Sequence, residues 1–201
     1  MAPPRCRLCD KAAHRVCAQC KLANYCNIDC VNLDQPFHSL LCTDGSDNSR
    51  PAFSELKRPA GDVTRCIFLP PDSDYPQWIW LPLENDKYRK QTMPKDHRVD
   101  ELMGEGVDYT YGHIHNTFAR RDHRGNIYVY TAFQREGAGL TVNRSVRMAS
   151  APHNVELLGP VLVAGSRDLE MDDFHIIIDH LVTWRTGVKG RELHPQVQDA
   201  K

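Results

Sequence analysis

Short apolar runs bounded by turn residues characterise the chain from residue 63 onwards. The runs at 65–69 and 78–81 are each followed by a proline, as strands that lead into turns often are. The run at 126–133 follows an Arg-Gly turn signal. Strands are therefore expected at residues 65–69, 78–81, 126–133, 140–142 and 159–165.

The clearest helix is predicted at residues 172–184. Its apolar side chains recur at positions i, i+3, i+4 and i+7, namely Phe174, Ile177, Ile178 and Leu181. Acidic residues at the start suit the positive end of a helix dipole, and Gly187 suits its exit. Residues 63–188 are therefore expected to form one small α+β domain, followed by a polar tail at 189–201.

The first 45 residues follow a different pattern. They contain few large apolar side chains, but seven of the eight cysteines lie before residue 43. So small an apolar content cannot fold a segment of this length by burial alone. Residues 46–62 mix Gly, Ser, Asp, Asn and Pro, and are expected to be a linker between this N-terminal segment and the α+β domain.

Composition narrows the meaning of these cysteines. The chain of 201 residues has a formal net charge of −1 and a mean hydropathy of −0.53, and no apolar run is long enough to span a membrane. The chain start has no apolar segment of the kind found in secretory signals. We therefore expect an intracellular protein, nuclear or cytoplasmic, whose crowded cysteines bind metal rather than form disulfides.

The cysteines and one histidine are spaced as zinc ligands, in the order C-x2-C-x7-C-x2-C-x5-C-x3-C-x7-H-x3-C. Pairs two residues apart can meet one ion from a tight turn. The pairs 26/30 and 38/42 share one face of a helix, so two short helices are expected, the second starting near Pro36. Eight ligands fill two tetrahedral Zn²⁺ sites, which are then closed and structural. The predicted ligands are Cys6, Cys9, Cys17, Cys20, Cys26, Cys30, His38 and Cys42.

This spacing, with Tyr25 directly before the fifth ligand, resembles the MYND-type zinc finger over residues 6–42. The resemblance implies interleaved ligation, which spacing alone leaves open: Cys6/Cys9/Cys26/Cys30 on one ion and Cys17/Cys20/His38/Cys42 on the other. It also implies protein partners, often proline-containing peptides in transcriptional regulation. The later part of the chain resembles a C-terminal region of some fungal MYND-finger proteins.

Several positions that line the peptide groove in this family differ here. The family's usual Gln, Trp and small polar residue are replaced by Val31, Gln35 and Ala18. We therefore expect weak binding of proline-containing peptides, and a partner surface formed instead by apolar residues such as Ile28, Leu33 and Phe37. In the alternative, Phe37 supplies the missing aromatic wall.

Nucleic acid is not the expected partner. Residues 1–42 hold five basic and three acidic side chains, and seven thiolates with two Zn²⁺ bring the finger to about −1. A finger without clustered positive charge is poorly suited to phosphate binding. A nucleic-acid-binding regulator therefore remains only an alternative.

An enzyme is the other alternative, with its site in the second domain near His113, His115 and Asp122. The trio Asp172, His175 and Asp179 also shares one helical face, where ordinary i,i+4 contacts are favoured over a general base. Cys66 is expected to be a buried, inert thiol. No catalytic residue is assigned, and the sequence favours a non-enzymatic zinc-binding adaptor or regulator.

Overall fold

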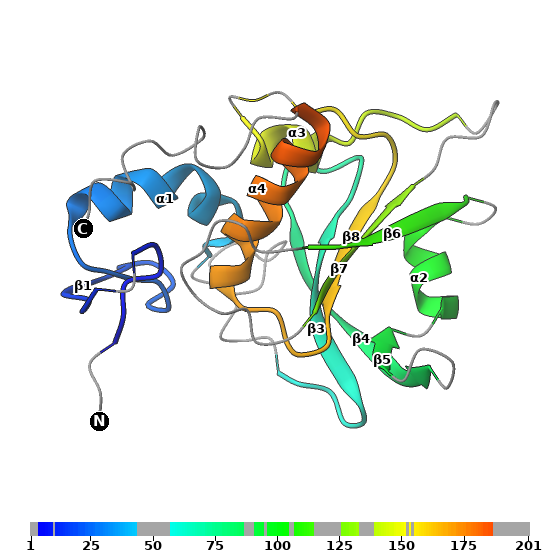
Figure 1. Cartoon of the computed structure of the whole chain (residues 1–201), viewed down its shortest axis with the longest axis horizontal. Coiled ribbons are helices and arrows are strands. Elements are labelled where there is room, and N and C mark those ends of the chain that lie inside the picture. Colours follow the sequence, from blue (N-terminus) through cyan, green and yellow to red (C-terminus); the bar gives the residue numbers. More distant parts are fainter. Residues whose placement is uncertain are drawn as a thin grey trace. The chain divides into compact units, whose positions relative to one another are not determined.

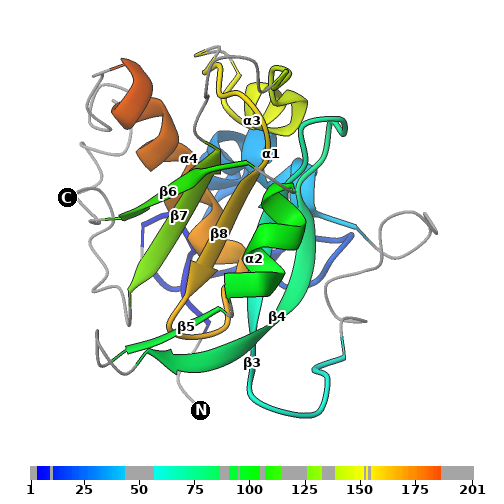
Figure 2. The same cartoon turned by 90° about the vertical axis from the view of Figure 1, so that its right-hand side faces the viewer.

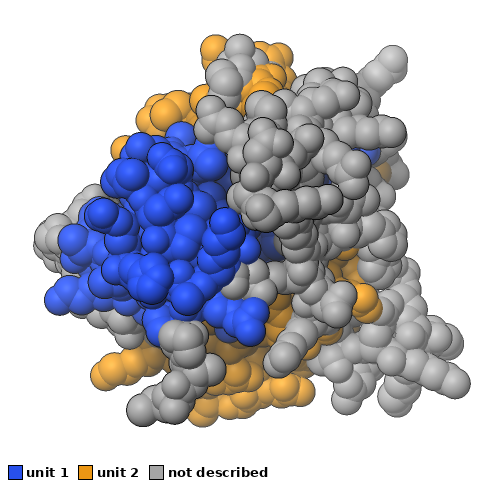
Figure 3. All heavy atoms as spheres, turned by 60° about the vertical axis from the view of Figure 1, so that its left-hand side comes forward, with its two compact units in different colours: residues 1–56, 115–123, 170–201 blue, residues 57–114, 124–169 orange. Residues whose placement is uncertain are grey.

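The computed structural model describes most of the chain, in two compact units that are coloured separately in Figure 3. The described residues are 4–9, 11–43, 57–86, 91–94, 96–104, 107–114, 126–132, 139–151, 153 and 155–186. Unit 1 contains the described residues up to 43 together with 170–186, and unit 2 contains the described residues from 57 to 169.

Unit 2 is built on a six-stranded antiparallel sheet with the order β5-β4-β3-β8-β7-β6 (Figure 1). The strands are β3 (Val63–Leu69), β4 (Gln77–Asp86), β5 (Gln91–Pro94), β6 (Tyr109–His113), β7 (Ile127–Ala132) and β8 (Val161–Gly165). β8 lies between β3 and β7, and its apolar run is buried at every position, so both of its faces are covered.

Helix α2 (Asp96–Met103) covers one face of this sheet, as Figure 2 shows. Its Val99 and Met103 pack into a buried cluster with alternate residues of four strands, among them Cys66, Tyr128 and Leu162. The alternation follows from the pleat, which turns successive side chains to opposite faces. Gly104 has φ +101°, and its N–H donates to the carbonyl of Asp100, so it ends α2.

Most of the strand predictions are confirmed. The expected strands at 65–69, 126–133 and 159–165 correspond to β3, β7 and β8. The strand expected at 78–81 is longer and does not end at Pro82. That proline lies where β4 changes partner, because residues up to 82 pair with β3 and residues from 83 pair with β5.

The strand expected at 140–142 is wrong. Val142 makes only an isolated bridge to Leu158, and the next residue, Asn143, caps helix α3 (Arg144–Ala149). The Asn143 side chain accepts from the N–H of Val146 and donates to the carbonyls of Leu69 and Gly159. A buried polar side chain with these partners starts a helix where the apolar pattern favoured a strand.

Unit 1 starts with a two-stranded ribbon, β1 (Arg15–Val16) and β2 (Asn24–Tyr25), followed by helix α1 (Ile28–Leu41). The side chain of Asn27 caps α1 by accepting from the N–H of Cys30 at 2.9 Å. The prediction of two short helices is wrong, because α1 runs continuously through Pro36. A proline inside a helix removes one backbone hydrogen bond, but the buried side chains of Phe37, Leu40 and Leu41 hold the turns of α1 that follow it.

Helix α4 (Met171–Thr186) is the helix predicted from the apolar stripe, and it groups with the finger in unit 1. Its start is fixed by Asp173, whose carboxylate accepts from the N–H of Glu170 at 2.7 Å. The stripe residues Phe174, Ile177, Ile178 and Leu181 are all buried. Among the described helices, none combines the length and the apolar character that crossing a membrane would require.

Candidate metal centre

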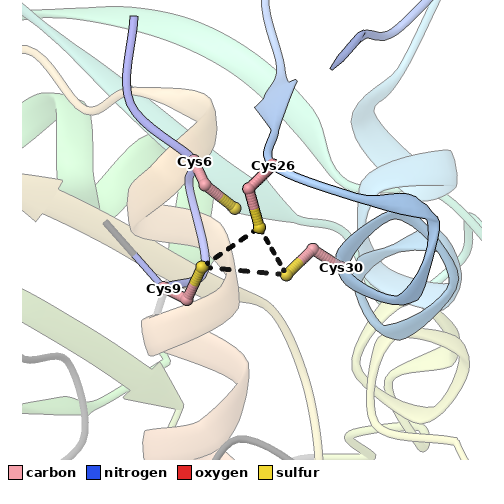
Figure 4. A group of neighbouring side chains, drawn as sticks. All are labelled: Cys6, Cys9, Cys26 and Cys30. Atoms are coloured by element: carbon pink, nitrogen blue, oxygen red, sulfur yellow. Dashed lines mark hydrogen bonds between the residues drawn. The ribbon is translucent and has the colours of Figure 1, made fainter. Parts of the chain in front are cut away.

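The first group of candidate ligands brings together two distant parts of the chain. Cys6 and Cys9 flank a tight turn, Cys26 follows β2, and Cys30 lies in the first turn of α1. Figure 4 shows the four side chains converging on one point. The sulfur–sulfur distances are 3.4 Å for Cys9–Cys26, 3.6 Å for Cys26–Cys30 and 3.9 Å for Cys9–Cys30.

These distances fit a tetrahedral zinc ion. Four sulfurs held about 2.3 Å from Zn²⁺ lie about 3.8 Å from one another. A disulfide would require about 2.05 Å between two sulfurs. The described cysteines form no disulfide, and the geometry of the first group is that of a metal site with four cysteine ligands.

The second group contains Cys17 and Cys20 from the turn after β1, with His38 and Cys42 from the last turn and end of α1. Nε2 of His38 lies 3.3 Å from the sulfur of Cys17 and 3.6 Å from that of Cys20. The sulfurs of Cys17 and Cys42 are 3.7 Å apart. Tetrahedral Zn²⁺ places a bound nitrogen and sulfur about 3.6 Å apart, so the second group fits a site with three cysteine ligands and one histidine.

Protonation of the thiols supports a cation at the centre of each group. Burial and the neighbouring thiolates raise the pKa of Cys30 and of Cys42. Burial also opposes ionisation at Cys6 and Cys17, but backbone N–H groups of their turns outweigh it and lower the pKa of both thiols. Thiolates held this close together repel one another, and a Zn²⁺ ion would supply the positive charge that offsets the repulsion.

A buried polar layer lies directly behind the second group. Asp34 is fully buried, accepts a hydrogen bond of 2.7 Å from the Tyr25 hydroxyl, and lies 3.1 Å from Nε of Arg7. Nη1 of Arg7 is in turn 3.1 Å from Nδ1 of His38, the ring nitrogen that faces away from the cysteines. Burial and the charge of Arg7 lower the pKa of His38 to about 4, so the ring stays neutral, as metal binding requires.

Helix α4 completes this layer. Nδ1 of His175 lies 3.4 Å from Oδ1 of Asp34, and its Nε2 lies 3.6 Å from Asp179. The i,i+4 contact between His175 and Asp179 was expected, but both side chains are buried rather than on an open polar face. Burial opposes a charge on Asp34, yet the neighbouring His175 ring and the charge of Arg7 outweigh it and lower the pKa of Asp34.

Sequence reasoning missed the roles of Arg7 and Asp34, which it treated only as charges. A signal for Asp34 was present: it lies four residues after Cys30 and four before His38, and therefore on the ligand-bearing face of α1. Nothing comparable marked Arg7, because its partners lie in two distant helices, His38 and Asp34 in α1 and Met171 in α4.

The other predicted sites fare differently. His113 ends β6, whereas His115 and Asp122 lie outside the described residues. Cys66 is fully buried in the sheet core, as expected for an inert thiol, and burial raises its pKa. His14, which lies between the Cys6–Cys9 and Cys17–Cys20 pairs, is exposed and belongs to neither ligand group.

The fold and ligand geometry thus define unit 1 as a zinc-binding finger with two interleaved, four-ligand sites, the pairing that the family resemblance implied. Comparison with known families gives its type, because the family described as MYND finger matches residues 6–42. No curated protein and no solved structure matched the chain. MYND fingers bind zinc and mediate contacts between proteins; the resemblance of the later segment to fungal proteins stays a prediction.

Proposed function

We propose that this chain is a non-enzymatic zinc-binding adaptor or regulator that acts through protein contacts of its finger. The observation that carries the proposal is the complete ligand set of both candidate sites. Cys6, Cys9, Cys26 and Cys30 would occupy every position around one ion, and Cys17, Cys20, His38 and Cys42 around the other. A Zn²⁺ ion with four protein ligands has no open position for water or substrate, so its role is structural.

The exposed apolar side chains of the finger support this proposal. Val16, Leu22 and Ile28 are 53%, 39% and 50% exposed. We place the proposed partner contact at these large apolar side chains, which the described part of the finger leaves in water. Transcriptional regulation is the setting that the family resemblance favours for that contact.

The proposed partner surface excludes Phe37. That side chain is buried, and its ring packs against the His175 ring with centroids 4.6 Å apart. It therefore neither belongs to an open partner surface nor supplies an aromatic wall for a proline-containing peptide. Val31 is partly buried against the first ligand group, and Gln35 is exposed. Partner binding is thus proposed at Ile28 and the other exposed residues rather than in a rebuilt peptide groove.

Surface variants of the zinc-loaded full chain test the proposal. Proteins captured from cells on immobilised chain are purified and titrated by calorimetry against the wild type, Ile28→Glu and Leu22→Glu. The matched control is Met148→Glu, an exposed apolar residue of unit 2 that is 48% accessible. A true finger partner should bind the two finger variants at least tenfold more weakly and the control unchanged. The proposal fails if no purified protein binds, or if every binder ignores both finger variants.

A further inference from the structure

Asp34 of α1 occupies a buried polar pocket in the finger. Its carboxylate is 0% exposed, and its two oxygens have separate partners. Oδ2 accepts a hydrogen bond of 2.7 Å from the Tyr25 hydroxyl and lies 3.1 Å from Nε of Arg7, while Oδ1 lies 3.4 Å from Nδ1 of His175. An ionised carboxylate removed from water is stable only with such partners, so Asp34 ties together the segments that carry them.

The partners of Oδ2 lie in the segments that hold the first ligand group. Arg7 belongs to the turn at residues 6–9, and Tyr25 is the last residue of β2, directly before a ligand. Asp34 itself lies about one helical turn after Cys30. The turn, the residue after β2 and the start of α1 supply all four cysteines of this group. The carboxylate therefore connects every segment that the first site requires.

Backbone and apolar contacts hold the same three segments together. The N–H of Arg7 donates to the carbonyl of Asn24 in β2 at 2.9 Å, which attaches the turn to this strand. Cys6, Tyr25 and Cys30 share one buried cluster, which packs the turn and β2 against α1. Because these elements are already in close contact, a shift of the buried acid would be transmitted to the ligand sulfurs.

The second ligand group has no equivalent support among the described contacts. The turn at residues 17–20 supplies two of its ligands, and no contact described for Asp34 reaches that turn. Arg7 approaches Nδ1 of His38 at 3.1 Å, but an imidazole that binds metal through Nε2 keeps its proton on Nδ1. A guanidinium can only donate, so this approach does not favour metal at the second site.

Helix α4 reaches the pocket from the other end of the chain. His175 faces Oδ1 of Asp34, and its ring packs against Phe37 of α1 with centroids 4.6 Å apart. The Arg7 guanidinium also donates to the carbonyl of Met171, the first residue of α4. The helix thus contacts both the buried acid and the turn that carries the first two ligands.

We propose that Asp34 is a positioning residue for the all-cysteine site and that α4 supports the same site through His175. The carboxylate holds the three ligand-bearing segments in the arrangement in which their sulfurs converge on one point (Figure 4). Metal at the first site and docking of α4 on α1 then stabilise each other, because both depend on Asp34 being in place. This linkage is reciprocal, so occupancy of the all-cysteine site affects how firmly the C-terminal helix is held.

Metal release from the full-length protein tests this proposal. Co²⁺-loaded wild type, Asp34→Asn and His175→Ala are mixed with a chelator, and the absorption of the all-cysteine site and of the histidine-containing site is followed separately. The all-cysteine site should release its ion at least about tenfold faster in both variants, as expected for loss of a contact to a buried charge. The histidine-containing site should stay close to its wild-type rate.

Two matched control variants change the same residue types at exposed positions. Asp100→Asn removes an acid of α2 in unit 2, and His14→Ala removes a histidine of the finger that is not a ligand. Both should release metal as the wild type does. Unchanged release in Asp34→Asn and His175→Ala would overturn the proposal, and so would faster loss from the histidine-containing site alone. Equal acceleration of both sites would overturn it as well, since that result signals loss of the finger as a whole.

The conservative variant His175→Asn separates positioning from bulk, because an asparagine amide can place a donor where Nδ1 of the histidine lies. It should restore slow release from the all-cysteine site. Release as fast as from His175→Ala would overturn the role of α4, because the donor to Asp34 would then have no effect.

Hydrogen exchange tests the reciprocal effect. Once a chelator has removed the absorption of the all-cysteine site from the wild type, residues 171–186 of α4 should exchange faster, while β3 and β8 of unit 2 keep their protection. An α4 that stays protected after loss of that absorption would contradict the linkage.

Discussion

Replacement of Tyr25 by phenylalanine isolates a single hydrogen bond of the buried layer. The Tyr25 ring is 2% exposed, and its hydroxyl donates to Asp34 at 2.7 Å. Burial and then the negative charge of Asp34 raise the pKa of Tyr25, so the hydroxyl stays protonated and remains a donor. Phenylalanine keeps the ring and its packing, and only the donor is lost.

The expected cost follows from the partners that remain. A hydrogen bond to a charged group contributes about 1.5–3 kcal/mol, and a buried acceptor left short of a partner loses this contribution. Asp34 retains Arg7 at 3.1 Å and His175 at 3.4 Å, so its charge is still compensated. We therefore expect about 2 kcal/mol, which raises the opening equilibrium of the finger about 30-fold.

Hydrogen exchange of the zinc-loaded full chain, resolved by peptide, measures this opening in α1 and β2. The matched control is Tyr75→Phe in unit 2, where the side chain is 44% exposed and the expected change is below about 0.5 kcal/mol. Exchange of the finger within twofold of wild type in Tyr25→Phe would refute the reasoning that Asp34 depends on this donor.

Other predictions concern the metal, the thiols, the α3 cap and peptide binding. Elemental analysis should find two zinc ions per chain, and Cys17→Ala should hold fewer and lose finger protection; one zinc or none in the wild type would contradict the two-site structure. With an alkylating reagent at pH 8, the native chain should be unreactive, chelator should expose seven thiols, and only denaturant should expose Cys66. Early labelling of Cys66 at pH 8 would show that the core of unit 2 is open. Burial and then the charge of Asp168 raise the pKa of Cys66 above the unfolded value of about 9. The stability that this thiol contributes to unit 2 should therefore be lost only as the pH rises past that value. Asn143→Ala removes three buried hydrogen bonds and should lower the free energy of unfolding of unit 2 by about 2–4 kcal/mol in thermal or denaturant unfolding, and a change below about 1 kcal/mol would mean that the cap is dispensable. A proline-containing peptide titrated into the zinc-loaded full chain should bind more weakly than about 100 μM, because a missing stacked Trp commonly costs about 2 kcal/mol or more, and low-micromolar binding would contradict this.

Sequence alone determined the parts of this protein that depend on neighbours along the chain. The spacing of the cysteines and His38 identified the ligand set, because two-residue turns and i,i+4 helix positions bring donors together locally. The apolar run of β3 and the apolar stripe of α4 are likewise local patterns, and both elements were located within a few residues.

Local patterns were misleading or silent where packing outweighed propensity. Pro82 indicated a strand end, but β4 continues through it because the strand changes partners there. Helix α2 is short and largely polar, and strand β6 carries only five residues, so neither gave a strong periodic signal. Both elements are held by contacts across the sheet or along its edge, which no window of sequence contains.

Only the tertiary structure decided which ligands share an ion and which charges are buried together. Spacing permitted sequential or interleaved pairing, whereas the folded finger places Cys6 and Cys9 beside Cys26 and Cys30. Asp34 and His175 are 141 positions apart, and their local sequence marked Asp34 only as a charge and His175 only as part of one helical face. The roles of these side chains depend on burial, because an ionised carboxylate removed from water needs partners. The fold brings Arg7 and His175, which lie far apart along the chain, to Asp34.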